Sequence, residues 1–214
     1  MAGIILNGSV IKGLMLNGSS VSAMLNGVKV FPAEEPGPTP VPLPANTIRV
    51  RTSDGNPPNK GSASYETATL VEGTTDVYDV YKSGTSFKNL LYNSSNVIEV
   101  LGGNTTGITD MSYMFYYIEM LKTVAVFDTS TVSNMDRMFY ACTDLKAVPL
   151  LNTSLASNTY RMFYGCRSVE TGALALYQQM SAHPPFTHGQ TFRNCGSSTT
   201  TGSAELEQIP SDWK

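Results

Sequence analysis

The sequence has few charged residues and only two histidines. Charged residues make up 14% of the chain, whereas about 25% is typical of soluble proteins. The formal net charge is −3, so we expect neither nucleic acid nor an anionic membrane surface as a partner. No apolar run reaches the roughly 18 residues of a membrane-spanning helix, and we expect no membrane insertion. The first residues, MAGIILNGSV, have no basic segment before their apolar run, so we expect no secretory signal.

A short repeat occupies the start of the chain. The tripeptide Leu-Asn-Gly recurs at 6–8, 16–18 and 25–27, with apolar residues on both sides. Asn-Gly is favoured in two-residue hairpin turns, so residues 1–31 are predicted to form a small all-β module of short strands. A module of about 30 residues buries too little surface to be stable alone. We therefore expect it to dock on a partner or to form a homo-oligomer; the alternative is that it packs on the rest of the chain.

Residues 32–45 are rich in proline and read PAEEPGPTPVPLPA. Such a segment favours extended polyproline II, rises about 3.1 Å per residue and acts as a semi-rigid spacer. It cannot join a sheet, because each proline removes a backbone donor. We interpret it as a linker that holds two modules apart, and the alternative is a ligand for an aromatic groove.

The remaining residues, 46–214, are dominated by a 24-residue repeat. The pattern Met-x-x-Met-Phe ends at Phe115 and Phe139, and a copy that begins with threonine ends at Phe163. A fixed period of this length is typical of a leucine-rich-repeat-like solenoid. The i, i+3, i+4 spacing predicts a short helix with one buried stripe in each unit. The residues predicted to cap these helices are Asp110, Asn134 and Asn158.

The other parts of each unit, and the two ends of the solenoid, are also predicted from the pattern. Residues 121–126 and 145–148 are predicted strands. Residues 48–52 and 65–72 alternate in polarity and are predicted to form a hairpin-like N-terminal cap beside 77–81, the first repeat strand. Residues 170–182 favour a longer helix in a C-terminal cap, closed by 209–213. The predicted fold class is α+β: a leucine-rich-repeat-like solenoid of short helix–strand units with a β N-cap and a helical C-cap, preceded by the all-β module and the linker.

The few histidines and cysteines give little support to catalysis or metal binding. His183 and His188 lie in the loop HPPFTHGQ without a nucleophile motif beside them, so we predict no enzyme, no catalytic residue and no cofactor. A metal site could draw on Cys166, Cys195 and both histidines, but their spacing matches no usual zinc pattern. Because Cys142, Cys166 and Cys195 share one repeat position, we favour buried reduced thiols and predict no metal ligands.

Two rows of equivalent repeat positions are candidate binding surfaces. Tyr113, Arg137 and Arg161 lie between the apolar anchors and point away from the buried stripe, and tyrosine and arginine are enriched at binding hot spots. Lys122 and Lys146 belong to a second exposed row. An ordinary solvated surface is the alternative for both rows. A further column of equivalent positions consists of tyrosines, which we interpret as half-buried packing residues. The alternative is that they form a recognition stripe. The column comprises Tyr92, Tyr116, Tyr140 and Tyr164.

The repeat VSNMDRMFYACTDLKAVPLLNTS (132–154), with its copies over residues 87–169, resembles the BspA-like leucine-rich surface-repeat family. The resemblance implies a solenoid of short helix and strand, which occurs on bacterial surface adhesins and in phage-encoded proteins. This chain differs from the usual adhesin because it shows no evident signal peptide or wall anchor and places a hairpin module and a linker first.

By analogy, this layout is similar to that of a phage virion protein. Residues 1–31 would dock on a capsid or tail protein, and the solenoid would bind a host cell-surface polysaccharide or protein. These features predict a non-enzymatic virion structural protein, assembled in the host cytoplasm, that displays its repeat domain for host attachment. Two alternatives stay open: a capsid or tail decoration protein without a receptor role, and a bacterial adhesin at the cell surface.

Overall fold

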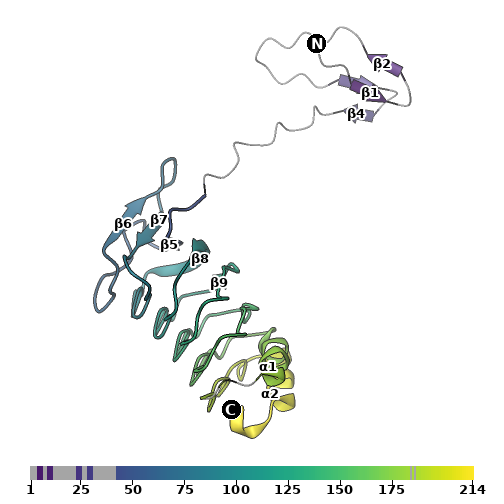
Figure 1. Cartoon of the computed structure of the whole chain (residues 1–214). Helices are drawn as coiled ribbons and strands as arrows, with labels where there is room; N and C mark the ends of the chain where they lie inside the picture. The colour runs from purple at the N-terminus through teal and green to yellow at the C-terminus, as the bar shows by residue number, and fades with distance from the viewer. Residues whose placement is uncertain are drawn as a thin grey trace. The chain divides into compact units, whose positions relative to one another are not determined.

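The structure, a computed structural model, describes residues 4–6, 9–11, 23–25, 28–30, 42–183, 185 and 187–214. The chain divides into two units, residues 1–41 and 42–214 (Figure 1). Within its described residues, the first unit contains two antiparallel hairpins, β1 (Ile4–Leu6) with β2 (Ser9–Ile11) and β3 (Ala23–Leu25) with β4 (Val28–Val30). These strands lie where the first and third Asn-Gly pairs predict them. The second Leu-Asn-Gly, at 16–18, and residues 32–41 of the predicted linker lie outside the described residues.

A mixed five-stranded sheet begins the second unit. Its strands lie in the order β6-β7-β5-β8-β9, and only β8 and β9 are parallel. Ile48, Val50 and Val80 are fully buried, which agrees with one apolar face of an alternating strand pattern. The predicted strands 48–52 and 65–72 do not pair with each other, because β7 lies between them. The five strands are β5 (Thr47–Thr52), β6 (Thr67–Leu70), β7 (Val77–Tyr81), β8 (Val97–Asn104) and β9 (Thr123–Val124).

The predicted fold class, a leucine-rich-repeat-like solenoid of short helix–strand units, is wrong. In the described part of the chain, the regular elements of the second unit are this open sheet and two short α-helices, α1 (Ala173–Ala182) and α2 (Thr200–Gln208), followed by the 3-10 helix η1 (Ser211–Trp213). Residues 112–117 form turns rather than a helix, and residues 145–148 contribute an isolated bridge from Ala147 to Thr171 rather than a strand. Of the predicted C-terminal cap, α1 is present within 170–182, whereas α2 was not predicted. None of the described helices has the length and hydrophobicity needed to cross a bilayer.

Consecutive turns replace the predicted helix because alternate amides bond to the neighbouring repeat. Met114 donates its N–H to the carbonyl of Met111, three residues back, at 3.2 Å. The next residue, Phe115, instead donates its N–H to the carbonyl of Met138 in the following repeat, at 2.8 Å. A helix would need that amide for its own i to i−4 bond. Tyr113 closes the turn with a left-handed φ of 57°, a conformation that an α-helix does not contain.

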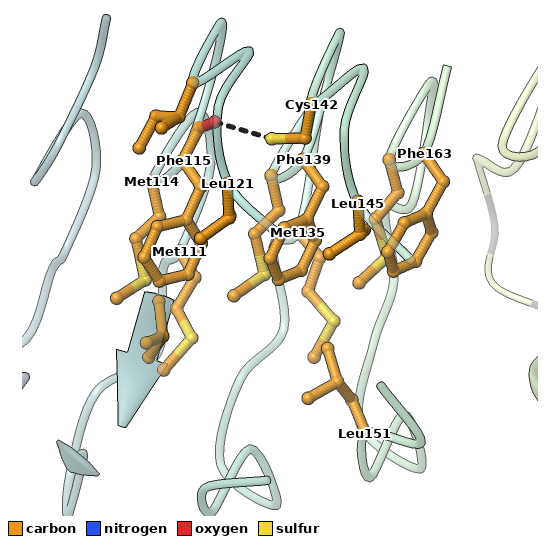
Figure 2. Packing of buried hydrophobic residues seen from close by; sticks show 14 of the residues in the cluster. Met111, Met114, Phe115, Leu121, Met135, Phe139, Cys142, Leu145, Leu151 and Phe163 are labelled. Atoms are coloured by element: carbon orange, nitrogen blue, oxygen red, sulfur yellow. Dashed lines mark hydrogen bonds between the residues drawn. The ribbon is translucent and has the colours of Figure 1, made fainter. Parts of the chain in front are cut away.

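Equivalent residues of successive repeats pack directly on one another (Figure 2). The rings of Phe115, Phe139, Phe163 and Phe192 are fully buried, and successive centroids are 5.1, 5.0 and 6.0 Å apart. Neighbouring rings lie within 19° of parallel. The apolar pattern therefore predicted the buried residues correctly, although the backbone that carries them is not helical. The buried methionines of the pattern are Met111, Met114, Met135, Met138 and Met162.

A substitution at Ala141 tests the turn geometry. Ala141 has a φ of 58°, and Gly165 occupies the equivalent position in the next repeat with a φ of 76°. We expect Ala141→Gly to change the free energy of unfolding by less than about 0.5 kcal/mol, because relief of the left-handed strain offsets the larger entropy of the unfolded chain. Ala141→Val should lower it by about 2 kcal/mol, because a β-branched residue is strained at positive φ. Urea unfolding measures both, and equal effects of the two substitutions would contradict this geometry.

Candidate functional site

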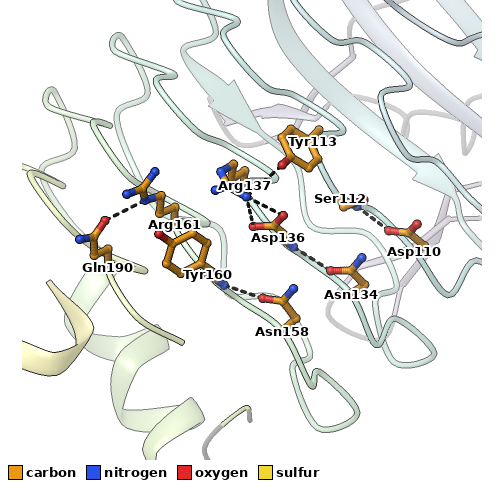
Figure 3. Close-up of polar contacts among 10 residues, drawn as sticks. All are labelled: Asp110, Ser112, Tyr113, Asn134, Asp136, Arg137, Asn158, Tyr160, Arg161 and Gln190. Carbon is orange, nitrogen blue, oxygen red and sulfur yellow. Dashed lines mark hydrogen bonds and ion pairs between the residues drawn. The ribbon is translucent and has the colours of Figure 1, made fainter. Parts of the chain in front are cut away.

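Tyrosine and arginine side chains of the stacked repeats form a row in which the two residue types alternate, and Figure 3 shows its first four members, Tyr113, Arg137, Tyr160 and Arg161. We call this row the Tyr–Arg face; it comprises Tyr113, Arg137, Tyr160, Arg161, Tyr164 and Arg193. Each guanidinium carbon lies close enough to a tyrosine ring for a cation–π contact, whose usual limit is about 6 Å. The distances to the ring centroids are 5.5 Å (Arg137–Tyr113), 4.8 Å (Arg137–Tyr160), 4.8 Å (Arg161–Tyr160), 5.5 Å (Arg161–Tyr164) and 5.9 Å (Arg193–Tyr164).

Arg137 is held by a charged partner as well as by rings. Its Nη1 donates to the hydroxyl of Tyr113 at 2.9 Å and to both carboxylate oxygens of Asp136 at 2.8 and 2.9 Å. Burial is the largest single effect on Arg137 and by itself lowers the pKa, but the electrostatic interactions with Asp136, Tyr113 and Tyr160 and the hydrogen bond to Asp136 together raise that pKa. Burial, followed by the charge of Asp136, raises the pKa of the Tyr113 hydroxyl. The positive charge of Arg137 is therefore compensated within the protein.

The two arginines at the C-terminal end of the face have neutral neighbours. Arg161 donates its Nε–H to the side-chain oxygen of Gln190 at 2.7 Å and lies beside the rings of Tyr160 and Tyr164. Arg193 is exposed and lies over the ring of Tyr164. Neither guanidinium forms an ion pair within the described residues. Their charges are thus available to an anionic group from outside.

The backbone fixes the positions of these side chains. The side-chain oxygen of Asn158 accepts the N–H of Tyr160 at 3.0 Å, and Asn134 does the same for Asp136 at 3.2 Å (Figure 3). The predicted helix caps are therefore Asx turns, in which the side chain bonds two residues ahead. Arg137 and Arg161 lie at φ 51° and 54°, where glycine or asparagine would be less strained. The equivalent residues of the other repeats, Asn89, Tyr113 and Gln190, also have positive φ, so this conformation is a property of the turn.

The structure places the sequence-predicted candidates in two separate rows. Tyr113, Arg137 and Arg161 lie in one row with the ring contacts given above. Lys122 and Lys146 are exposed and belong to another segment of the repeat, where the N–H of Lys146 donates to the carbonyl of Lys122 at 3.0 Å. Neither lysine side chain makes a hydrogen bond or ion pair within the described part of the chain. These lysines are a solvated row without an organised site.

Two of the six residues of the Tyr–Arg face, Tyr160 and Arg193, were missing from the residues singled out in the sequence. Tyr160 was missed because a helix would turn it away from Arg161, whereas in these turns the two neighbours lie side by side, with a guanidinium-to-ring distance of 4.8 Å. Arg193 was missed because its repeat is displaced by 29 residues rather than 24. The signal that could have identified it is its place directly after Phe192, which matches that of Tyr164 after Phe163.

The column of tyrosines beside this face is half-buried, as predicted. Its rings stack face to face, with successive centroids 4.7, 4.9 and 4.8 Å apart. Burial is the main cause that raises the pKa of the Tyr116 hydroxyl. Because each inner ring covers its neighbours' faces, the column contributes packing. The column comprises Tyr92, Tyr116, Tyr140 and Tyr164.

The cysteines are buried and reduced, as the shared repeat position predicted. The thiols of Cys142 and Cys166 donate to the carbonyls of Phe115 and Phe139, both at 3.1 Å. Burial raises the pKa of Cys166 to about 12 and raises the pKa of Cys142 well above its ordinary value. Within the described residues, no group of three or more His, Cys, Asp or Glu side chains could hold a metal ion.

A family model matches residues 85–194, the segment that holds the repeats and all residues of the Tyr–Arg face. The family is described as "Mycoplasma protein of unknown function, DUF285". No curated protein and no solved structure matches the chain significantly.

The three thiols should be unreactive in the folded chain. A thiol reacts as its thiolate, and burial holds the pKa of Cys166 near 12 and those of Cys142 and Cys195 well above the ordinary value. We expect no labelling by iodoacetamide at pH 8 under native conditions and labelling of all three cysteines in urea, as counted by mass spectrometry. Rapid labelling of any of the three in the folded chain would contradict this burial.

Proposed function

The chain belongs to the family described as "Mycoplasma protein of unknown function, DUF285", and we propose that it is a non-enzymatic phage virion protein that binds the host cell surface through the Tyr–Arg face. The observation that carries this proposal is the alternation of rings and guanidiniums from Tyr113 to Arg193. Tyrosine and arginine are among the residues that supply most of the binding energy at interfaces.

The Tyr–Arg face is organised before a ligand arrives. Ring contacts hold the three guanidiniums, and Asx turns fix the backbone at Asp136 and Tyr160. Ordering a mobile arginine side chain on binding costs about 0.5–1.5 kcal/mol, and much of that cost is already met here. A surface built in this way favours binding over an ordinary solvated role.

The N-terminal unit supports a display role. Its two described hairpins have strands of only three residues each, and isolated two-stranded hairpins are marginally stable in water. In the proposal, residues 1–31 dock on a phage capsid or tail protein, or assemble as a homo-oligomer. The proline-rich residues 32–45 then hold the repeat-bearing unit away from the particle.

The surroundings of the cysteines and of His188 disfavour a catalytic role for these residues. The cysteines are buried, and their raised pKa values keep the thiols neutral. His188 stacks on Trp213 at a ring distance of 4.1 Å. These positive features support a binding protein rather than an enzyme. The bacterial adhesin is the second candidate, because the family description names Mycoplasma, a bacterium.

Adsorption of phage particles to host cells tests the proposed function. Particles that carry Arg161→Gln should adsorb at least about tenfold more slowly than wild-type particles, because a hydrogen bond to a charged group contributes about 1.5–3 kcal/mol. Lys146→Gln removes the same single charge from the other row and should leave adsorption unchanged. Thermal melting of each purified chain checks that the fold is intact, and Arg193→Gln, at an exposed residue, serves as a second variant.

The other outcomes each contradict a part of the proposal. Normal adsorption of the Arg161→Gln and Arg193→Gln particles would exclude the receptor role and favour a decoration protein. A chain that immunoblotting finds on the bacterial surface but not in purified particles would exclude the virion role and favour the adhesin.

A further inference from the structure

We infer that the ligand of the Tyr–Arg face is a carboxylated polysaccharide, an inference that rests on the proposed function. Three features carry it: the charge of the face, the cleft at one end of the face, and the regular spacing of the tyrosine column.

The face is positively charged, although the whole chain has a net charge of −3. The charge of Arg137 is compensated by Asp136, so it attracts a ligand weakly. Arg161 and Arg193 flank the ring of Tyr164 and have no acidic partner among the described residues. Guanidinium groups match carboxylates in a two-bond planar geometry. The C-terminal end of the face is thus suited to an anionic group.

A shallow, open cleft of about 350 Å³ lies at the other end of the face. Tyr113 belongs both to this cleft and to the face, so the two surfaces are continuous. Lys88 is exposed and forms no ion pair within the described residues. The lining offers an ammonium group, hydroxyls, an amide and aromatic rings, a mixture suited to a sugar that bears hydroxyls and a carboxylate. The residues that line the cleft are Ser62, Lys88, Asn89, Tyr92 and Tyr113.

The tyrosine column connects the two cationic ends. It begins at Tyr92 in the cleft and ends at Tyr164 between the two arginines. Its ring centroids repeat every 4.7–4.9 Å. Among the described residues, none of the four hydroxyl oxygens is both buried and without a hydrogen-bond partner. A regular row of hydroxyls fits a ligand that repeats the same polar groups. A polysaccharide repeats in this way, whereas the side chains of a folded protein surface do not.

Binding of the full-length chain to defined polymers tests the inference. We expect binding to polygalacturonate, alginate or hyaluronate, all carboxylated, and none to neutral dextran at the same concentration. Arg161→Gln and Lys88→Gln should each weaken binding at least about tenfold, since each removes a charge-assisted hydrogen bond. Lys146→Gln is the matched control and should stay within about twofold. Binding should also weaken steeply from 50 to 500 mM salt, because the attraction is screened.

Several results would overturn the inference. They are equal binding to dextran, failure with all three carboxylated polymers, equal losses in Lys146→Gln and Arg161→Gln, or tighter binding to polyglutamate or to single-stranded DNA. If Arg161→Gln slows phage adsorption while none of the carboxylated polymers binds, the proposed function stands and this inference alone fails. If adsorption is also unaffected, both fail.

Discussion

The structure of residues 85–194 depends on backbone hydrogen bonds between successive repeats. Alternate amides, such as that of Phe115, donate to the next repeat instead of to their own turn. This pattern keeps equivalent residues in register, and it requires left-handed φ values at positions such as Tyr113 and Arg137. Each non-glycine residue in that conformation costs roughly 1–2 kcal/mol. The stacked phenylalanine column and the inter-repeat bonds offset that cost, so the stability of each repeat depends on its neighbours.

The same register creates the surface on which the proposed function rests. Because the repeats stack in register, Arg137 meets Tyr113 and Tyr160 of the repeats on either side of it. Arg193 likewise meets Tyr164 of the preceding repeat, whereas Arg161 contacts Tyr160 and Tyr164 of its own turn. Asp136 forms an ion pair with Arg137 and compensates its charge. The positive charges of Arg161 and Arg193 stay uncompensated among the described residues. The backbone beneath the row is bonded in two directions, within the turn and to the next repeat. A positioned backbone and uncompensated positive charge suit a binding surface.

Much of the core, but not its backbone, could be predicted from the sequence. The period of the pattern identified the buried phenylalanines and methionines, and polarity and helix propensity located β5, β6, β7 and α1. The helices of the repeats were wrong because an i, i+3, i+4 spacing over five residues fits a run of β-turns as well as a helix. That error also hid Tyr160 from the candidate site. Arg193 was not identified because the last repeat is irregular. Helix α2 was not predicted because it contains many weak helix formers, Thr200 and Gly202 among them. The resemblance to the BspA-like family stays a prediction.

Unfolding of a Phe139→Ala variant tests the dependence between repeats most directly. Phe139 is fully buried between the rings of Phe115 and Phe163, whereas the single tryptophan, Trp213, packs near Phe192 at the far end of the column. If each repeat stabilises the next, the substitution should lower the free energy of unfolding by about 3–5 kcal/mol, and Trp213 fluorescence should report that loss in one transition. An unchanged Trp213 transition, with loss of structure only near residue 139, would contradict the account.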